Sequence, residues 1–286
     1  MGLGGFFSSM FASGKVDVWK RFERMRESTS GTMSNFFKVR DRKTGQVLGL
    51  KIIDVAKAAP VEGRYKSLNK PSEAEIASRI VGPNVVRTLE WGTTTAGEPF
   101  IVMEHLDGTL LHSLLAAHKP MSPAEKLDLV RQAATGIATV HTAGFVHRDI
   151  CPRNFILCFD GRLVLIDFGL TVPDTAAFLQ PGNRVGTPNY MAPEVVRRRP
   201  IDRRLDVFSF GVTAYEICTG GHAPWPRGNT GQAALAHDTT PIDIRTHWPD
   251  IPARLADAVM SCLEAEPERR PPTLARFLAQ IGGVRA

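Results

Sequence analysis

Two oxygen-bearing side chains lie at the two ends of a predicted β-hairpin in the second half of the chain. Within residues 154–167, two apolar runs flank the pair Asp160-Gly161, which is typical of a two-residue hairpin turn. That turn places Asn154 directly opposite Asp167, with their Cβ atoms about 5 Å apart. An amide oxygen and a carboxylate presented together suit Mg²⁺, which takes few protein ligands and completes its shell with water and phosphate. The sequence therefore predicts a metal site at Asn154 and Asp167.

A second carboxylate, Asp149, lies five residues before Asn154, so one loop brings it beside the predicted metal ligands. A carboxylate near Mg²⁺ but outside its ligand pair can orient a hydroxyl nucleophile and accept its proton, as phosphoryl transfer requires. His147 adds little by itself, because a lone histidine is more often a packed core residue. Together, Asp149, Asn154 and Asp167 predict phosphoryl transfer to a hydroxyl group.

The first third of the chain has the pattern of a strand-rich unit. The predicted strands are residues 36–40, 47–53, 85–91 and 99–103. Residues 71–81 are predicted to form a helix. Before the first strand, Val18, Trp19, Phe22 and Met25 recur at helical spacing, which predicts a short amphipathic helix. Residues 1–19 are expected to be an N-terminal extension that is poorly ordered or a short helix.

Helices are predicted to dominate after about Leu106. The run Ser122-Pro123-Ala124-Glu125 is a capping box with proline in the first turn, and Gly144 ends the helix that it begins. Residues 206–218 carry only Glu216 as a charge after Asp206, so this helix is apolar all round. Such a helix belongs at the centre of its unit.

In the order and spacing of its motifs, the chain resembles the eukaryotic-like serine/threonine protein kinase family. The motifs are His147-Arg148-Asp149 with Asn154, Asp167-Phe168-Gly169, Gly186-Thr187, Ala192-Pro193-Glu194, Asp206-x-x-Ser209-x-Gly211 and Arg270-Pro271. The similarity runs from about Phe22 to Phe277. It implies an α+β, bilobal protein kinase fold. The N-lobe, at residues 20–105, is small and β-rich and has one main helix. A larger, mainly helical C-lobe follows at residues 106–284, and ATP binds in the cleft between the lobes.

The resemblance implies an enzyme that transfers the γ-phosphate of MgATP to serine or threonine hydroxyls of proteins, using ATP and Mg²⁺ or Mn²⁺. The implied catalytic residues are Asp149, Lys51, Arg153 and Asn154, and the implied metal ligands are Asn154 and Asp167. The implied partners are protein substrates, with autophosphorylation as one reaction, in cytoplasmic signalling. Two other classes stay open: a nucleotide-binding pseudokinase scaffold with little or no transfer activity, and a small-molecule kinase. A small-molecule kinase has little use for the peptide-docking segment around Thr187.

Lys51 is the implied phosphate-binding lysine, in the run Gly49-Leu50-Lys51, and strand alternation places Gly49 and Lys51 on one face. In the following helix, Glu73 shares a face with apolar residues, whereas Glu75 points about 200° away. Burying Glu73 alone is costly, so it is expected to pair with Lys51. Glu75 is predicted to cap the helix after Ser72.

The other nucleotide-binding residues are implied by the resemblance. Met103 is the gatekeeper before the hinge at Glu104 and Leu106, whose backbone groups bind adenine in the family. The phosphate loop, Gly-x-Gly-x-x-Gly in the family, keeps only its middle glycine, Gly31. The full implied set is Thr29, Gly31, Ser34, Phe36, Gly49, Lys51, Glu73, Met103, Glu104, Leu106 and Ile156.

A second departure from the family is Cys151, which stands where a lysine usually follows the catalytic aspartate by two residues. That lysine steadies the transferred phosphoryl group, so its absence favours an inactive scaffold. Arg153 lies four residues after Asp149, where tyrosine kinases often carry a compensating arginine, so a cation can still reach the phosphate. The joint retention of Lys51, Glu73, Asp149, Asn154 and Asp167 favours an active kinase.

The segment between Asp167 and Glu194 carries the implied regulatory and substrate-docking residues. Thr187 lies in a run similar to that of serine/threonine kinases, in which this threonine contacts the catalytic loop. Thr171 and Thr175 are either phosphorylation sites, with Arg148 as the phosphate partner, or two solvated loop threonines.

Three further residues are assigned to the fold. Glu194 and Arg270 are expected to form a structural ion pair, and Asp206 to cap the central helix and brace the catalytic loop. The basic run at residues 197–199 and 203–204 either binds acidic substrates or forms a solvated face.

Composition excludes several other classes. The net charge is +6, with 43% hydrophobic and 22% charged residues, which is ordinary for a globular protein and not for a disordered one. No basic stripe interleaved with aromatic residues is present, so nucleic acid is not an expected partner. The four cysteines lack paired metal-site spacing, which favours a reducing, cytoplasmic setting. No apolar run is long enough to predict a transmembrane segment.

Overall fold

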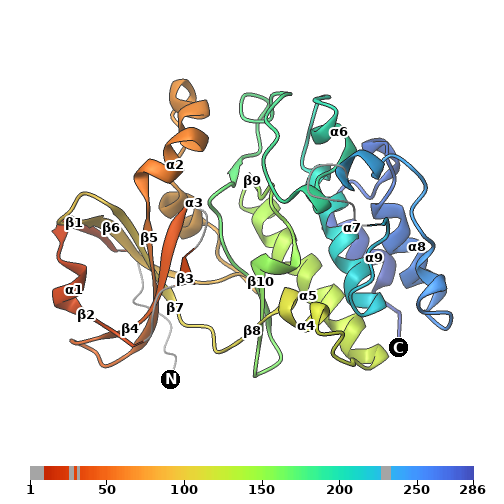
Figure 1. Ribbon diagram of the computed structural model, residues 1–286, viewed down its shortest axis with the longest axis horizontal. Helices are drawn as coiled ribbons and strands as arrows, with labels where there is room; N and C mark the ends of the chain where they lie inside the picture. The colour runs from red at the N-terminus through yellow and green to blue at the C-terminus, as the bar shows by residue number, and fades with distance from the viewer. Residues whose placement is uncertain (1–9, 26–28, 31–32, 227–232) are drawn as a thin grey trace. The chain divides into compact units, whose positions relative to one another are not determined.

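A computed structural model describes residues 10–25, 29–30, 33–226 and 233–286 of the chain. Its contacts define two units, of which Figure 1 shows the first as mainly strands and the second as mainly helices. The first unit comprises Val86–Asp107 and the described residues up to Val81, and the second comprises Gly82–Val85 and the described residues from Gly108 onward. The α+β character expected from the sequence is therefore present, with strands and helices largely segregated along the chain.

The first unit is built on a mostly antiparallel sheet with several short helices, of which α2 and α3 are the longest. Its strands are β1 (Met10–Val16), β2 (Phe22–Arg24), β3 (Thr29–Ser30), β4 (Ser34–Asp41), β5 (Val47–Ile53), β6 (Thr88–Thr94) and β7 (Pro99–Glu104). Its helices are α1 (Val18–Arg21), α2 (Val55–Glu62), the 3₁₀ turn η1 (Gly63–Leu68) and α3 (Glu73–Arg79). The strand order is β1-β6-β7-β5-β4-β2, with β3 also paired to β4. The central strand β5 has the bounds that the sequence predicts.

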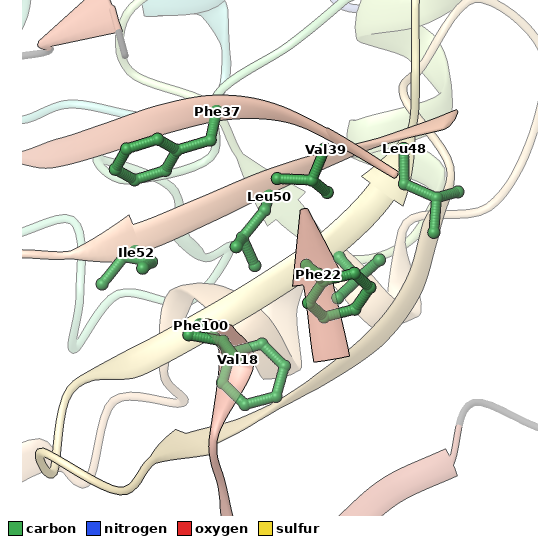
Figure 2. Close-up of a cluster of buried hydrophobic side chains, with 9 residues drawn as sticks. Val18, Phe22, Phe37, Val39, Leu48, Leu50, Ile52 and Phe100 are labelled. Atoms are coloured by element: carbon green, nitrogen blue, oxygen red, sulfur yellow. The ribbon is translucent and has the colours of Figure 1, made fainter. Parts of the chain in front are cut away.

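One face of this sheet is an apolar core, and strand alternation decides which residues reach it. Figure 2 shows this core. Its members are Val18, Phe22, Phe37, Val39, Leu48, Leu50, Ile52, Phe100 and Val102. Residues 36, 49, 51 and 103 alternate with these and therefore lie on the opposite face. The apolar packing of one face thus fixes the direction of the side chains on the other.

The N-terminal segment differs from the predicted amphipathic helix over residues 18–25. Only Val18–Arg21 is helical, and Phe22–Arg24 forms strand β2, which pairs with β4. Before them, Met10–Val16 pairs in parallel with β6 instead of forming a disordered tail or helix. A one-turn helix is marginal alone, whereas the sheet edges supply backbone partners to an extended chain. The apolar spacing identified Val18 and Phe22 as buried, but Trp19 is only partly buried and Met25 is 39% exposed, and the chain is extended from Phe22 onward.

Arg21 ties this N-terminal segment to two strands of the sheet. Its Nη1 donates to Glu90 at 2.7 Å, and its Nε and Nη2 donate to Asp41 at 3.2 and 3.0 Å. Burial alone would raise the pKa of Asp41, but bonds from the Lys43 amide and the Arg21 guanidinium hold that pKa below its ordinary value. The residues before the first predicted strand are therefore an integral part of this unit.

The second unit consists mainly of helices. Its helices are α4 (Leu111–Ala116), α5 (Pro123–Thr142), α6 (Pro193–Val196), α7 (Arg204–Thr219), α8 (Ala253–Cys262) and α9 (Leu274–Ile281). Its 3₁₀ turns are η2 (Pro152–Asn154), η3 (Pro188–Tyr190), η4 (Ala233–Ala236), η5 (Ile244–Thr246) and η6 (Pro267–Arg269). Its strands are β8 (Gly108–Leu110), β9 (Phe145–Val146), β10 (Phe155–Cys158), β11 (Leu163–Leu165) and β12 (Val172–Pro173). They form two small sheets, β11-β10-β8 and β12-β9.

Two helices of this unit match their sequence signals closely. Ser122 caps α5 through a reciprocal capping box with Glu125, and Pro123 is the first helical residue, as predicted. In α7, every residue after Arg204 is buried, in agreement with its apolar pattern, and the helix packs against α5 and α8. None of the described helices is long and apolar enough to cross a membrane.

The β10–β11 hairpin corrects the predicted register. The Cys158 amide donates to the Arg162 carbonyl, so the loop holds Phe159 in addition to Asp160-Gly161. Gly161 has φ +89°, the left-handed position that closes a three-residue hairpin loop. The extra loop residue shifts the pairing by one, and Asn154 lies opposite Ile166, whose amide donates to the Asn154 carbonyl, not opposite Asp167.

Candidate active site

The loop that carries Asp149 is anchored by a fully buried carboxylate. Asp206, in the first turn of α7, accepts hydrogen bonds from the backbone amides of His147 and Arg148, both at 2.8 Å, and lies 2.8 Å from Nε2 of His141. Burial alone would raise the pKa of Asp206, but His141 and the Arg148 amide hold that pKa below its ordinary value. The predicted bracing of the loop is present. The predicted capping of the helix is wrong, because α7 begins after Arg203 and the Asp206 carboxylate faces the loop instead.

Burial lowers the pKa of His147, despite the nearby carboxylates of Asp206, Asp149 and Asp167. The imidazole is therefore neutral near pH 7, and its Nδ1 accepts a hydrogen bond from the Asp149 amide at 3.3 Å. In the sequence, His147 carried little weight by itself, and His141 was not singled out. Polar residues on apolar faces were the available signal, because a buried imidazole needs hydrogen-bond partners.

Three donors fix the carboxylate of Asp149. The backbone amide and the hydroxyl of Thr187 both donate to Oδ1 at 2.8 Å, and the Asn154 side-chain amide donates to Oδ2 at 3.0 Å. Gly186 precedes Thr187 with φ +107°, and a Cβ there would lie 2.6 Å from the Arg148 carbonyl. Only glycine lets this segment approach the loop so closely. The carboxylate therefore has a single, well-defined direction.

The donor chemistry at Asn154 and Asp167 fits a hard divalent cation. The Asn154 Nδ2 also donates to the Asp149 carbonyl at 2.7 Å, so the amide nitrogen is engaged with Asp149 and the amide oxygen is the atom that could bind a cation. Asp167 has φ +67°, and its Oδ1 accepts from the Gly169 amide at 3.0 Å. An amide oxygen and a carboxylate are the oxygen ligands that Mg²⁺ takes.

Cys151 lies inside this loop as a neutral group. Its side chain is 1% exposed, and Sγ is 3.6 Å from the Thr187 hydroxyl. Burial, with a contribution from Asp149, raises the pKa of the thiol to about 11, so it carries no charge at physiological pH. Arg153, two residues on, is exposed to solvent.

In the first unit, the predicted ion pair between Lys51 Nζ and Glu73 Oε1 is present, and both side chains are about one-tenth exposed. Glu75 forms the predicted capping box with Ser72, whose amide donates to Glu75 Oε2 at 2.7 Å. The backbone and hydroxyl of Ser72 lower the pKa of Glu75. Helix α3 therefore lies within the predicted range 71–81 and begins after Ser72, with Glu73 turned inward and Glu75 capping.

The remaining predicted nucleotide-binding residues occupy several elements. Phe36 pairs with Lys51, and Gly49 pairs with Met103, so these four share one face of the sheet. Ser34 pairs with Ile53 at the end of β5.

Thr29 pairs with Phe36 through its backbone in β3, whereas Gly31 lies outside the described residues. The Glu104 carboxylate accepts from the Arg87 amide at 2.9 Å at the end of β7, two residues before Leu106. Ile156 belongs to β10 of the second unit, opposite Leu110.

The two candidate phosphorylation sites differ in exposure. Thr171 is 0% exposed, and its hydroxyl has no hydrogen-bond partner among the described residues, so it is neither a solvated threonine nor accessible to an enzyme in this conformation. Thr175 is exposed. Arg148 is 6% exposed and donates to the Asn183 carbonyl at 3.5 Å in the same segment. The apolar neighbours Leu170 and Val172 were the available sequence signal for the burial of Thr171.

The residues assigned to the fold form a buried ion pair. Arg270 donates from Nη1 and Nη2 to the two carboxylate oxygens of Glu194 at 2.7 and 2.8 Å, and both residues are 3% exposed. Such bidentate geometry is the strong form of this interaction.

The basic run is largely neutralised by this chain's own carboxylates. The pairs are Arg197 with Asp238, Arg199 with Glu266, Arg203 with Asp174 and Arg204 with Asp202. These contacts leave little charge for an acidic substrate, and the run is better described as a set of surface ion pairs.

The strand-rich first unit and the helical second unit are those of a bilobal α+β kinase domain. A sequence model of the protein kinase domain family matches residues 22–280. The chain belongs to the protein kinase family. This result confirms the resemblance that the motifs indicate.

Similar proteins carry serine/threonine-protein kinase names. The chain is 31% identical to serine/threonine-protein kinase pkn2 of Myxococcus xanthus over 92% of its own length and 32% of the relative's. It is 29% identical to PknB of Mycobacterium leprae over 88% of its length and 41% of the relative's. It is 34% identical to PknL of Mycobacterium bovis over 72% of its length and 50% of the relative's. The chain thus spans a third to a half of these relatives.

Proposed function

We propose that this chain is an active protein kinase that transfers the γ-phosphate of ATP to serine or threonine hydroxyls of protein substrates. The observation that carries the proposal is the Asp149 carboxylate, which is held by Thr187 and Asn154 in one direction. A carboxylate fixed in this way can accept the hydroxyl proton of a substrate and orient the oxygen for attack. The names of the similar proteins support the same activity and the same acceptor residues.

Asn154 and Asp167 are the proposed Mg²⁺ ligands. When bound, Mg²⁺ neutralises phosphate charge and so favours transfer. In the first unit, Lys51 is the proposed phosphate-binding cation, and its pairing with Glu73 holds the ammonium group in position. These assignments rest on side-chain chemistry and on the motif order, and each can be tested by substitution.

Thr187 supports a serine or threonine acceptor. Its amide and hydroxyl both contact Asp149, so the segment that leads to Ala192-Pro193-Glu194 is tied to the proposed catalytic carboxylate. Substrate docking on this segment would therefore bring an acceptor hydroxyl close to Asp149. We propose autophosphorylation at exposed Thr175 as a related reaction, and not at buried Thr171.

A second candidate function is a nucleotide-binding scaffold without transfer activity, and Cys151 favours it. The neutral, buried thiol stands where the family carries a lysine, so this loop position supplies no cation to the transferred phosphoryl group. Exposed Arg153 is the proposed replacement, because its guanidinium is always charged and binds phosphate well. The two candidates differ in whether phosphate is transferred, not in whether nucleotide binds.

The deciding experiment compares the wild-type chain with Asp149→Asn and Arg153→Ala. Labelled γ-phosphate transfer from MgATP to the chain and to a generic basic protein is measured, with MgATP binding and thermal melting as controls. An active kinase predicts transfer to serine or threonine that falls at least about 1,000-fold in Asp149→Asn, with binding nearly unchanged. Arg153→Ala is expected to reduce transfer about tenfold or more. Nucleotide binding by the wild type without any transfer would establish the scaffold instead.

A further inference from the structure

The segment from Thr187 to Glu194 is held near one end by Asp149 and farther along by a buried histidine from a later part of the chain. His237 directly follows the turn η4, 46 residues after Met191, and its Nδ1 is 2.7 Å from the Met191 carbonyl oxygen. A carbonyl can only accept a hydrogen bond, so Nδ1 carries the proton. Among the described residues, no backbone amide donates to the same oxygen. The imidazole is therefore the group that satisfies this carbonyl.

Two aromatic side chains hold the imidazole of His237 in place. Its ring centroid lies 4.8 Å from that of Trp225 and 5.5 Å from that of Phe208, which belongs to the buried helix α7, and the histidine is 3% exposed. Burial lowers the pKa of His237, although the Met191 carbonyl and Asp238 act in the opposite direction. The ring is therefore neutral near pH 7, and packing gives its hydrogen bond a single direction.

The chain around His237 makes a second contact with the region after the docking segment. Asp238 pairs with Arg197, which directly follows helix α6, and η4 contacts both η3 and α6. The preceding carbonyl, that of Tyr190, accepts from the Ser209 hydroxyl of α7 at 2.7 Å. The consecutive carbonyls of Tyr190 and Met191 are thus bonded to two different elements, which fixes the course of the backbone here.

We propose that His237 is a positioning residue for substrate docking: through the Met191 carbonyl, it keeps residues 187–194 in the conformation that accepts a protein substrate. The inference deepens the proposed function and rests on it, because this segment docks an acceptor only if the chain is a protein kinase. When the hydrogen bond is lost, the segment adopts other conformations, and the apparent affinity for the substrate falls with the competent fraction. The bonds from Thr187 to Asp149 are separate, so the chemical step is little affected.

The test separates the hydrogen bond from the aromatic packing by two opposite substitutions. His237→Phe keeps an aromatic ring against Trp225 and Phe208 but has no donor. His237→Asn loses the ring but keeps a donor nitrogen close to the position of Nδ1. Transfer of labelled γ-phosphate by the full chain is measured over a range of concentrations of a generic basic protein and of MgATP. The melting temperature of each variant is recorded alongside.

The two variants are expected to rank in opposite orders for docking and for stability. His237→Phe should raise the KM for the protein substrate at least about fivefold, because the Met191 carbonyl loses its donor. Its kcat and its KM for MgATP should stay within about twofold of the wild type. His237→Asn should restore most of the KM but melt at a lower temperature, because buried ring surface is lost.

A merely structural role would give a different result. Loss of folded molecules lowers the apparent kcat and leaves the KM unchanged, and it would be greater in the variant that melts lower. An unchanged KM for the protein substrate in His237→Phe, or an equal rise in His237→Asn, would therefore overturn the inference and leave the proposed function intact. If His237→Asn does not fold, the contrast between KM and kcat in His237→Phe decides alone.

His247→Phe is the matched control in the same unit. This histidine is exposed and stacks on His222, with ring centroids 4.3 Å apart, so its replacement by another flat ring should change neither KM nor kcat. A rise in the KM for the protein substrate equal to that of His237→Phe would overturn the inference. Absence of phosphate transfer by the wild type would overturn the proposed function and this inference together.

Discussion

The two units hold their proposed site residues in place by different physical means. Lys51 lies within strand β5, where its neighbours Leu50 and Ile52 pack into the apolar core on the other face. Asp149 lies in a loop, where no strand register determines the side-chain direction, and its position depends on polar contacts with Thr187, Asn154 and the Asp206 anchor behind them. A side chain on a strand is oriented by packing, whereas a side chain on a loop needs buried hydrogen-bond partners.

This difference bears on which substitutions each unit tolerates. In the first unit, Phe36 and Gly49 are close neighbours on adjacent strands, and a substitution of similar total volume there is expected to keep the sheet intact. In the second unit, the backbone amides that donate hydrogen bonds to Asp206 are buried and cannot form hydrogen bonds with water instead. Unpaired buried polar groups are costly, so this network is expected to tolerate change poorly.

The largest expected effect is the loss of the buried anchor in the second unit. Asp206→Ala removes the acceptor of two loop amides and of His141, so the free energy of unfolding should fall by about 3–5 kcal/mol. Urea unfolding gives the value, and transfer activity should fall with it because the loop is released.

Asp202→Ala is the matched control, since Asp202 belongs to a half-exposed pair with Arg204 and should lose less than about 1 kcal/mol. If Asp206→Ala is too unstable to purify, Asp206→Asn, which keeps one acceptor oxygen, should lie between the two. Equal losses for Asp206→Ala and Asp202→Ala would break the distinction between the units.

A somewhat smaller loss is expected from the apolar core of the first unit. Phe22 is 1% exposed and packs from the N-terminal segment onto the core face of the sheet (Figure 2). Phe22→Ala should lower the free energy of unfolding by about 3 kcal/mol, through lost burial and a residual cavity.

The prediction for Phe22→Ala also concerns the dependence of stability on pH. Because Phe22 is apolar, the loss measured by urea unfolding should be the same at pH 6 and pH 8. Trp19→Ala, at a partly buried position on the rim of this core, should lose less. A strongly pH-dependent loss for Phe22→Ala would mean that the first unit also depends on a titrating network.

The smallest effect is a pH dependence that belongs to the second unit. Burial lowers the pKa of His147, although Asp206, Asp149 and Asp167 act in the opposite direction and His141 lies nearby. In the unfolded chain a histidine titrates near pH 6.5. Below that value the unfolded chain binds a proton that folded His147 does not, so folded stability decreases as pH falls. The decrease is up to about 1.4 kcal/mol per pH unit.

His147→Leu should reduce the change in the free energy of unfolding with pH between pH 6.5 and 5.5. Between pH 7.5 and 8.5, the stability of this variant should change with pH as that of the wild type does. Asp206, whose pKa is lowered, does not obscure the measurement, because its contribution is lost only in more acidic solution. Urea unfolding at four pH values provides the comparison. Identical slopes for the two proteins between pH 6.5 and 5.5 would show that His147 is protonated equally in both states.

Local signals in the sequence predicted the elements whose causes are local. Strand β5 and the start of α5 at Ser122 are as expected, because alternation and a capping box depend on neighbouring residues. The facing of Glu73 and Glu75 followed from the helical angle between them. The kinase family itself followed from the order of motifs along the chain, and the family comparison confirms it.

Features that depend on a distant partner could not be predicted in the same way. Whether Phe159 belongs to the loop or the strand decides the register of β10 and β11, and both turns were compatible with Asp160-Gly161. The helical spacing of Val18 and Phe22 was equally consistent with their burial by one turn of helix followed by a strand.

The sequence by itself determined the family, the inward direction of Glu73 on its helix and the chemical groups near Asp149. Only the tertiary structure decided that Met10–Val16 joins the sheet, that Thr171 is buried, and that carboxylates from other segments neutralise the arginine run. The physical reason is that hydrogen-bond capacity and charge are properties of a residue, but burial and pairing depend on which distant residues the fold brings to it. Gly49 illustrates both, since its missing side chain is visible in the sequence and the ring that fills the space is visible only in the fold.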